Sequence, residues 1–136
     1  MKIFIIAGED SGDKLGAAII DGLRNALKNS PTFVGIGGTG MQSRGMNSIF
    51  PLSELSVMGF LEIASQYKNL KKRLNQTVSC ILDEQPDILL TIDAPEFCFR
   101  VAKRVKYLNK NIPIAHDVAP TVWAWRPKRA KKISYF

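Results

Sequence analysis

The apolar residues of this sequence form short continuous runs separated by longer stretches in which they recur at helical spacing. The short runs do not alternate apolar with polar residues, a pattern typical of strands covered on both faces of a parallel sheet. Strands are expected at 2–7, 32–36, 88–92 and 112–116, with a shorter strand at 47–50. Helices are expected at 15–27, 41–44, 55–81 and 95–108. Because strand and helix alternate throughout, the sequence predicts a doubly wound parallel α/β sheet of five strands.

The first strand turns directly into the first helix through an acidic loop, GEDSGD at 8–13. A loop in this position lies at the carboxyl edge of the sheet, where open α/β folds bind ligands. The glycine spacing does not match the dinucleotide-binding pattern, and Lys14 is not part of a nucleoside-triphosphate loop. The three carboxylates of the loop would also repel a phosphate, so the loop is better suited to hydroxyl groups.

Several side chains of this acidic loop also have an ordinary structural interpretation. Ser11 or Asp10 can cap the helix, and Asp13 can complement the helix dipole. Capping does not exclude contact with a substrate. Glu9 precedes the cap, so capping explains its presence less well, and it can extend over the edge of the sheet.

A second carboxylate reaches the same edge of the predicted sheet. The strand at 88–92 is followed by Asp93, much as the first strand is followed by Glu9. Asp93 can cap the next helix, in which Pro95 suits the first turn. A carboxylate at a strand end that faces a second carboxylate is also where acid–base chemistry would be placed. Both interpretations stay open.

The last strand leads into a loop of unusual composition at 117–127, which contains both tryptophans of the chain. Two tryptophans in one loop are costly to expose and often line a substrate cleft. His116 is the single histidine, so a structural role is favoured over a metal site. Cys80 and Cys98 lack the spacing of a metal site, and buried or idle thiols are expected.

The length of 136 residues suits one domain with its own core, and 46% of the residues are hydrophobic. No apolar run is long enough to span a bilayer and no signal peptide is recognisable, so a cytosolic location is expected. The net charge of +7 favours an anionic partner. Basic residues cluster at 68–73, 100–106 and 126–132, where each cluster can also be a solvated helix face. Nucleic-acid binding is not favoured, because aromatic residues are not interleaved with these clusters.

The first half of the predicted helix at 55–81 has more apolar residues than one buried face requires. Val57, Phe60 and Ile63 add a second apolar face just before the basic cluster that begins at Lys68. A helix that is apolar on all sides is usually buried. Apolar residues beside Lys and Arg also favour an anionic membrane surface, so burial and an interfacial helix are both open.

Five motifs, in this order along nearly the whole chain, resemble the lipid-A-disaccharide synthase family of bacterial lipid A assembly. They are AGEDSGD (7–13), VGIGG (34–38), ELSVMG (54–59), IDAPEF (92–97) and APTVWAWR (119–126). The resemblance implies a Rossmann-like fold like the N-terminal half of a two-domain GT-B glycosyltransferase. It implies that residues 1–136 are a single, truncated acceptor-side domain from which the C-terminal donor domain is absent.

The resemblance implies an inverting hexosyltransferase that joins UDP-diacylglucosamine to diacylglucosamine 1-phosphate and needs no metal or organic cofactor. The acceptor hydroxyl loses a proton in such a reaction, and a carboxylate can take it. The family's motifs imply catalytic roles for Asp93 and Glu9. They imply substrate binding by Gly8, Ser11, Gly12, Asp13, Met58, Pro120 and Trp123. They imply contact with membrane or acyl chains by Val57, Phe60, Leu61, Ile63, Tyr67 and Leu70.

The resemblance also implies a location and a limit on activity. The enzyme is expected to be cytoplasmic and peripheral on the inner membrane, with an anionic membrane surface as a partner and no nucleic acid. The chain alone is expected to have little or no transferase activity without a donor domain, which a separate gene could encode. The alternative function is a non-catalytic membrane- and lipid-binding remnant. The family usually has Tyr at the position of Asp117, so this chain has an added charge beside the tryptophans.

Overall fold

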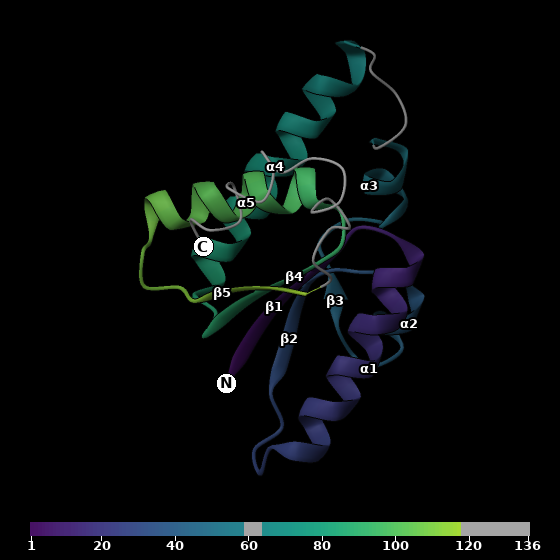
Figure 1. Cartoon of the computed structure of the whole chain (residues 1–136), viewed down its shortest axis with the longest axis vertical. Coiled ribbons are helices and arrows are strands. Elements are labelled where there is room, and N and C mark those ends of the chain that lie inside the picture. The colour runs from purple at the N-terminus through teal and green to yellow at the C-terminus, as the bar shows by residue number, and fades with distance from the viewer. Residues whose placement is uncertain (59–63, 118–136) are drawn as a thin grey trace, which may run out of the picture.

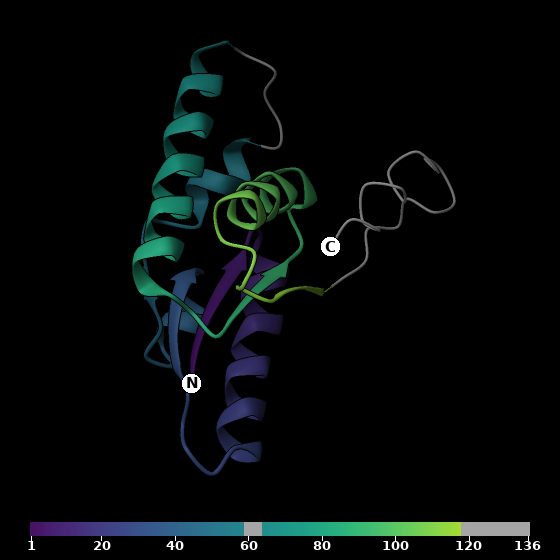
Figure 2. The ribbon, with the colours of Figure 1, turned by 90° about the vertical axis from the view of Figure 1, so that its left-hand side faces the viewer.

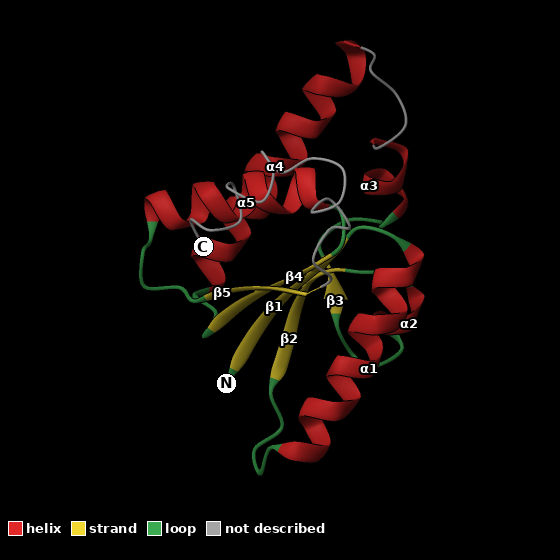
Figure 3. Cartoon of the chain, viewed as in Figure 1, coloured by secondary structure: helices red, strands yellow, loops and turns green. Residues whose placement is uncertain are grey.

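The computed structural model describes residues 1–58 and 64–117, with side chains described at 1–55 and 67–117. Within these residues, five parallel strands form one sheet in the order β3-β2-β1-β4-β5 (Figures 1 and 3). The strands are β1 Lys2–Ala7, β2 Thr32–Ile36, β3 Asn47–Ser48, β4 Ile88–Ile92 and β5 Ile114–Asp117. The predicted five-stranded parallel sheet is confirmed, although β3 is shorter than expected and β5 begins later.

Helices cover both faces of this sheet (Figures 1 and 2). They are α1 Asp10–Ala26, α2 Thr39–Gln42, α3 Ser53–Met58, α4 Ala64–Glu84 and α5 Pro95–Leu108. Side chains of α1 and α2 share one core with one face of the sheet, and side chains of α3, α4 and α5 share a second core with the other face. None of the described helices combines the length and the hydropathy that crossing a membrane requires.

The central strand β1 explains why the strands appear in the sequence as continuous apolar runs. Phe4 and Ile6 belong to the core beneath α4 and α5. Ile3 and Ile5 belong to the core beneath α1 and α2. All four side chains are buried. Because helices cover both faces, neither face of the strand needs polar residues.

The prediction of one long helix over 55–81 is wrong. The described residues there form two helices, α3 and α4, which are not coaxial (Figures 1 and 2). Glu54 of α3 contacts Arg73 of α4 at 2.5 Å, whereas one continuous helix would separate these residues by about 28 Å along its axis. The apolar spacing persists across both helices because Leu55 of α3 and Val78 of α4 pack into the same core.

Candidate active site

Asp93 lies at the carboxyl edge of the sheet, directly after β4. In the parallel pair of β1 and β4, Ala7 is opposite Ile92, so the residues that follow, Gly8 and Asp93, are neighbours. The backbone N–H of Gly8 donates a hydrogen bond of 2.6 Å to Oδ1 of Asp93. Asp93 and the next residue, Ala94, both have left-handed backbone, with φ of 51° and 40°. The acidic loop and the end of β4 are therefore joined through this carboxylate.

The alternative interpretation of Asp93 as the cap of α5 is wrong. The N-cap residue of α5 is Ala94, and it makes no side-chain capping hydrogen bond. The Asp93 carboxylate instead bonds to the backbone of the loop that opens α1, 85 positions away in the sequence. The Asp93 carboxylate is therefore held by the loop after β1 and does not cap its own helix.

The environment of Asp93 favours its protonated form. The pKa of Asp93 is raised from 3.8 to about 6, with burial as the largest cause and the negative charge of Glu9 as a smaller one. The backbone N–H groups of Gly8, Glu9 and Gly12 oppose this rise by favouring the carboxylate. Oδ2 of Asp93 is buried and has no hydrogen-bond partner among the described residues. This side chain is thus a half-buried acid with one oxygen uncommitted.

Glu9 and Ser11 lie on the exposed side of the same loop. Glu9 itself is the N-cap residue of α1 and makes no side-chain capping hydrogen bond, so capping of α1 by Ser11 or Asp10 is wrong. The structure brings Glu9 and Asp93 to one edge of the sheet, close enough for the charge of Glu9 to raise the pKa of Asp93. Their catalytic roles remain predictions.

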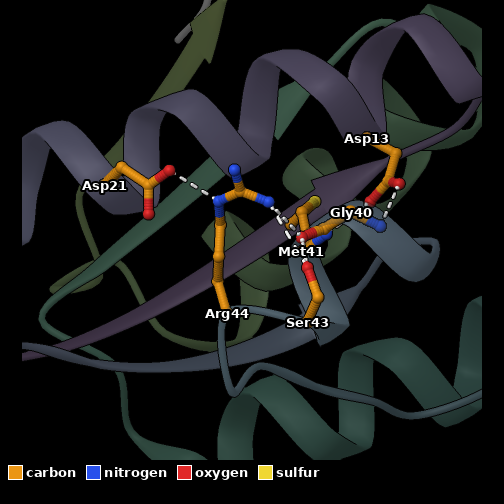
Figure 4. A network of polar contacts seen from close by, with 6 residues as sticks. All are labelled: Asp13, Asp21, Gly40, Met41, Ser43 and Arg44. Atoms are coloured by element: carbon orange, nitrogen blue, oxygen red, sulfur yellow. Dashed lines mark hydrogen bonds and ion pairs between the residues drawn. The ribbon is translucent and has the colours of Figure 1, made fainter.

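Asp13 has a structural contact that its sequence position does not reveal. The side chain is only 6% exposed, although it lies in the first turn of α1. Its carboxylate accepts a hydrogen bond of 2.8 Å from the backbone N–H of Gly38. It accepts two more, of 2.8 and 3.0 Å, from the backbone N–H groups of Gly40 and Met41 (Figure 4). Asp13 therefore anchors the start of α2 to α1, and its contact with substrate remains a prediction.

A second polar contact joins α1 to the turn that follows α2. Arg44 donates to Asp21 at 2.6 Å and to the carbonyl oxygen of Gly40 at 2.9 Å (Figure 4). Both partners of this ion pair are substantially exposed. This ion pair therefore supports the attachment that Asp13 provides, and its charges stay in contact with solvent.

The histidine and the two cysteines are buried or half-buried. Nδ1 of His116 is 2.7 Å from Oγ1 of Thr91, and its ring lies 5.0 Å from the ring of Phe99. These contacts agree with a structural histidine. Cys98 is buried and Cys80 is half-buried, and burial raises the pKa of both thiols. Within 1–58 and 64–117, no three His, Cys, Asp or Glu side chains gather as they would around a metal ion.

The predicted membrane residues divide into described and undescribed ones. Tyr67 is 62% exposed, whereas Leu70 is half-buried and packs against the core. Outside the described side chains lie Val57, Met58, Phe60, Leu61, Ile63, Pro120 and Trp123. For those seven residues the roles remain predictions.

The fold has a counterpart among solved structures. UDP-GlcNAc 2-epimerase from Neisseria meningitidis, bound to UDP-GlcNAc, is similar with a TM-score of 0.61 and 14% sequence identity. The similarity covers 98% of this chain and 37% of that chain. At this identity it supports the fold alone, a Rossmann-like sheet of the GT-B kind.

Sequence comparison is more specific. Lipid-A-disaccharide synthase from Rhodospirillum centenum is 46% identical over 136 residues, which is 100% of this chain and 34% of that protein. The enzyme of the same name from Ruegeria pomeroyi is 48% identical over 134 residues, 98% of this chain and 33% of that protein. The chain thus spans about a third of the length of the curated relatives it matches. A family model described as lipid-A-disaccharide synthetase matches residues 3–136. The chain belongs to the lipid-A-disaccharide synthase family, a family of glycosyltransferases.

Proposed function

We propose that this chain carries the acceptor side of an inverting glycosyl transfer. In this reaction a diacylglucosamine unit passes from UDP-diacylglucosamine to diacylglucosamine 1-phosphate. The observation that carries the proposal is the half-buried carboxylate of Asp93 beside the charge of Glu9 at the carboxyl edge of the sheet. Membership of the lipid-A-disaccharide synthase family supports the class of reaction.

Asp93 is the proposed general base. A hydroxyl of the acceptor attacks the anomeric carbon of the donor sugar on the face opposite UDP. The new C–O bond forms while the bond from that carbon to the phosphate oxygen breaks, and UDP leaves with the electron pair. The hydroxyl proton passes to the Asp93 carboxylate. With a pKa of about 6, Asp93 is a stronger base than an ordinary Asp and is still mostly ionised at pH 7.

Glu9 is the proposed partner of this base. Its charge raises the pKa of Asp93, and its exposed carboxylate can accept a hydrogen bond from an acceptor hydroxyl. The exposed Ser11 is the next polar group of the same loop. Contacts by Met58, Pro120 and Trp123 with the substrate rest on the family motifs alone.

We propose that the UDP group binds to the part of the relatives that this chain does not match. The chain matches about a third of each relative, and its described residues form one α/β sheet. We therefore expect the 136 residues on their own to have little or no transferase activity.

The proposed partner surface is an anionic membrane, because donor and acceptor both carry acyl chains. Tyr67, Lys68, Lys71 and Lys72 are exposed along the first half of α4, an arrangement that suits a peripheral position on the inner membrane. Reversing two of these charges, Lys71→Glu with Lys72→Glu, should weaken sedimentation with phosphatidylglycerol vesicles several-fold.

The matched control for this membrane experiment is Lys28→Glu with Lys110→Glu, two exposed lysines outside α4. The control changes the net charge equally and should reduce vesicle binding much less. Equal losses from both pairs would mean that net charge alone, and not a surface on α4, drives the binding.

A chimera tests the proposed transferase function. Residues 1–136 would replace the matching third of the Rhodospirillum centenum relative, whose 46% identity gives the exchange a good prospect of folding. We expect mass spectrometry to detect disaccharide product from the chimera and none from the 136 residues alone. A folded chimera that makes no disaccharide would contradict the proposed function.

A further inference from the structure

Two glycines of the acidic loop lie directly against Asp93 and Ala94. A Cβ atom added to Gly12 would lie 2.0 Å from Oδ2 of Asp93 and 2.7 Å from its Cγ. A Cβ atom added to Gly8 would lie 2.0 Å from Cβ of Ala94 and 2.8 Å from Oδ1 of Asp93. Real Cβ atoms essentially never approach another atom closer than 3.0 Å. With Asp93 and Ala94 in their present positions, only glycine fits at either place.

Backbone conformation does not explain these glycines. The described glycines with positive φ are Gly35 and Gly45, and neither Gly8 nor Gly12 is among them. An L-residue could therefore adopt the backbone angles of Gly8 and Gly12, and the space taken by its side chain is what excludes it.

The space in front of Gly12 is filled by the Asp93 carboxylate, and the space in front of Gly8 by Cβ of Ala94 and the same carboxylate. Asp93 and Ala94 adopt consecutive left-handed conformations, which L-residues rarely do, and Oδ1 of Asp93 accepts the 2.6 Å hydrogen bond from Gly8. Strained backbone of this kind persists only where the surrounding contacts hold it in place. The contacts here are those of the loop that opens α1.

We propose that Gly8 and Gly12 are positioning residues, whose missing side chains let the Asp93 carboxylate lie against the amino end of α1. This role acts through Asp93, and direct contact of either glycine with substrate remains a prediction. The value of this role for catalysis rests on the proposed function, whereas the positioning itself does not. A side chain added at either glycine would move the Asp93 carboxylate away from the amino end of α1.

The first test is the pKa of Asp93 in a Gly12→Ala variant, measured by ¹³C NMR of its side-chain carboxyl group and assigned with Asp93→Asn. Since burial is the largest cause of the raised pKa, displacing the carboxylate toward solvent should lower the pKa from about 6 toward 3.8. The control is Gly22→Ala in the same helix, where an added Cβ meets nothing within 4 Å. The control should leave the pKa of Asp93 unchanged, and an unchanged pKa in Gly12→Ala would overturn the proposal.

The second test measures coupling between the two positions and remains decisive if Gly12→Ala alone does not fold. Gly12→Ala should lower the urea midpoint of the parent chain markedly. In an Asp93→Gly background the obstructing carboxylate is gone, so Gly12→Ala should leave the midpoint unchanged or raise it, as Gly22→Ala does. Equal destabilisation by Gly12→Ala in both backgrounds would show that the glycine serves something other than Asp93.

These two tests are independent of transferase activity. If the chimera makes no disaccharide while the coupling and the pKa change are observed, the proposed function fails and the positioning of Asp93 stands. If the chimera is active and Gly12→Ala changes neither quantity, the function stands and the positioning fails.

Discussion

Two aspartates of this chain show how the same side chain serves different purposes in different surroundings. Asp13 is buried, and its carboxylate accepts hydrogen bonds from three backbone N–H groups, one just before α2 and two within it. Asp93 is half-buried, and its Oδ2 has no hydrogen-bond partner among the described residues. A carboxylate bonded by several N–H groups contributes to stability, whereas a buried carboxylate oxygen without a partner marks a candidate functional group.

The contacts of Asp13 predict a large loss of stability in Asp13→Asn. The amide has one accepting oxygen, and its NH₂ group would face N–H donors that the carboxylate now satisfies. We expect the free energy of unfolding to fall by about 2–4 kcal/mol, as measured by urea denaturation. Asp21→Asn, which removes an exposed partner of Arg44, is the control and should cost less than about 1 kcal/mol. Similar losses in the two variants would argue against the anchoring role of Asp13.

The raised pKa of Asp93 predicts a pH dependence of stability. Between about pH 4 and pH 6 the folded chain holds a proton on Asp93 that the unfolded chain has released, so its contribution to the free energy of unfolding falls as pH rises through this window. Other carboxylates also titrate there, so the useful quantity is the difference between the parent and Asp93→Asn. Relative to this variant, the parent should be more stable at pH 4 than at pH 7. A difference that stays constant across this range would mean that the pKa of Asp93 is not raised.

At the scale of elements, an ion pair between Glu54 and Arg73 joins α3 to α4. Nε and Nη2 of Arg73 donate to the two carboxylate oxygens of Glu54, each at 2.5 Å. The guanidinium carbon of Arg73 also lies 4.8 Å from the centre of the Phe50 ring. The Arg73 and Glu54 side chains are 18% and 26% exposed, so solvent screens this pair less than a surface pair.

This geometry predicts measurable coupling between α3 and α4. In a double-mutant cycle of Glu54→Gln and Arg73→Met, urea denaturation should give a coupling free energy of about 1–2 kcal/mol. The comparison pair is Asp21 with Arg44, whose side chains are 49% and 36% exposed and whose coupling should be below about 1 kcal/mol. Coupling at Glu54 and Arg73 no larger than in the comparison pair would show that other contacts hold α3 in place.

At the scale of the whole molecule, the order of the strands creates the candidate site. β1 lies between β2 and β4, so the loop after β1 is adjacent to the end of β4, although Gly8 and Asp93 are 85 positions apart. All strands are parallel, so both loops open at the same edge. The order of the strands therefore brings the acidic loop next to Asp93.

The sheet and the edge could be predicted from the sequence because they follow from local patterns. Continuous apolar runs indicate strands covered on both faces, and the residue after each run must lie at the carboxyl edge. These local patterns place Glu9 and Asp93 at the same edge of the sheet. The bond of Asp93 to Gly8 does not follow from them, because strand order and the left-handed turn are not local properties.

Two further features could not be predicted because the contacts that set them are long-range. The bonds of Asp13 to Gly40 and Met41 join residues 27 and 28 positions apart. The separation of α3 from α4 is marked by the ion pair of Glu54 and Arg73, 19 positions apart. The apolar spacing continues from one helix to the other because both contribute to one core, so the sequence resembles a single helix.

The central claim is that the Asp93 carboxylate takes the proton in a glycosyl transfer, and Asp93→Asn in the active chimera tests it most directly. The amide has nearly the same shape but cannot accept the proton, so kcat should fall by about 10²- to 10⁴-fold while the acceptor still binds. The chimera with Gly22→Ala, a position with open space around it, is the control and should keep the activity of the parent. Disaccharide synthesis by Asp93→Asn within a few-fold of the parent would contradict the account.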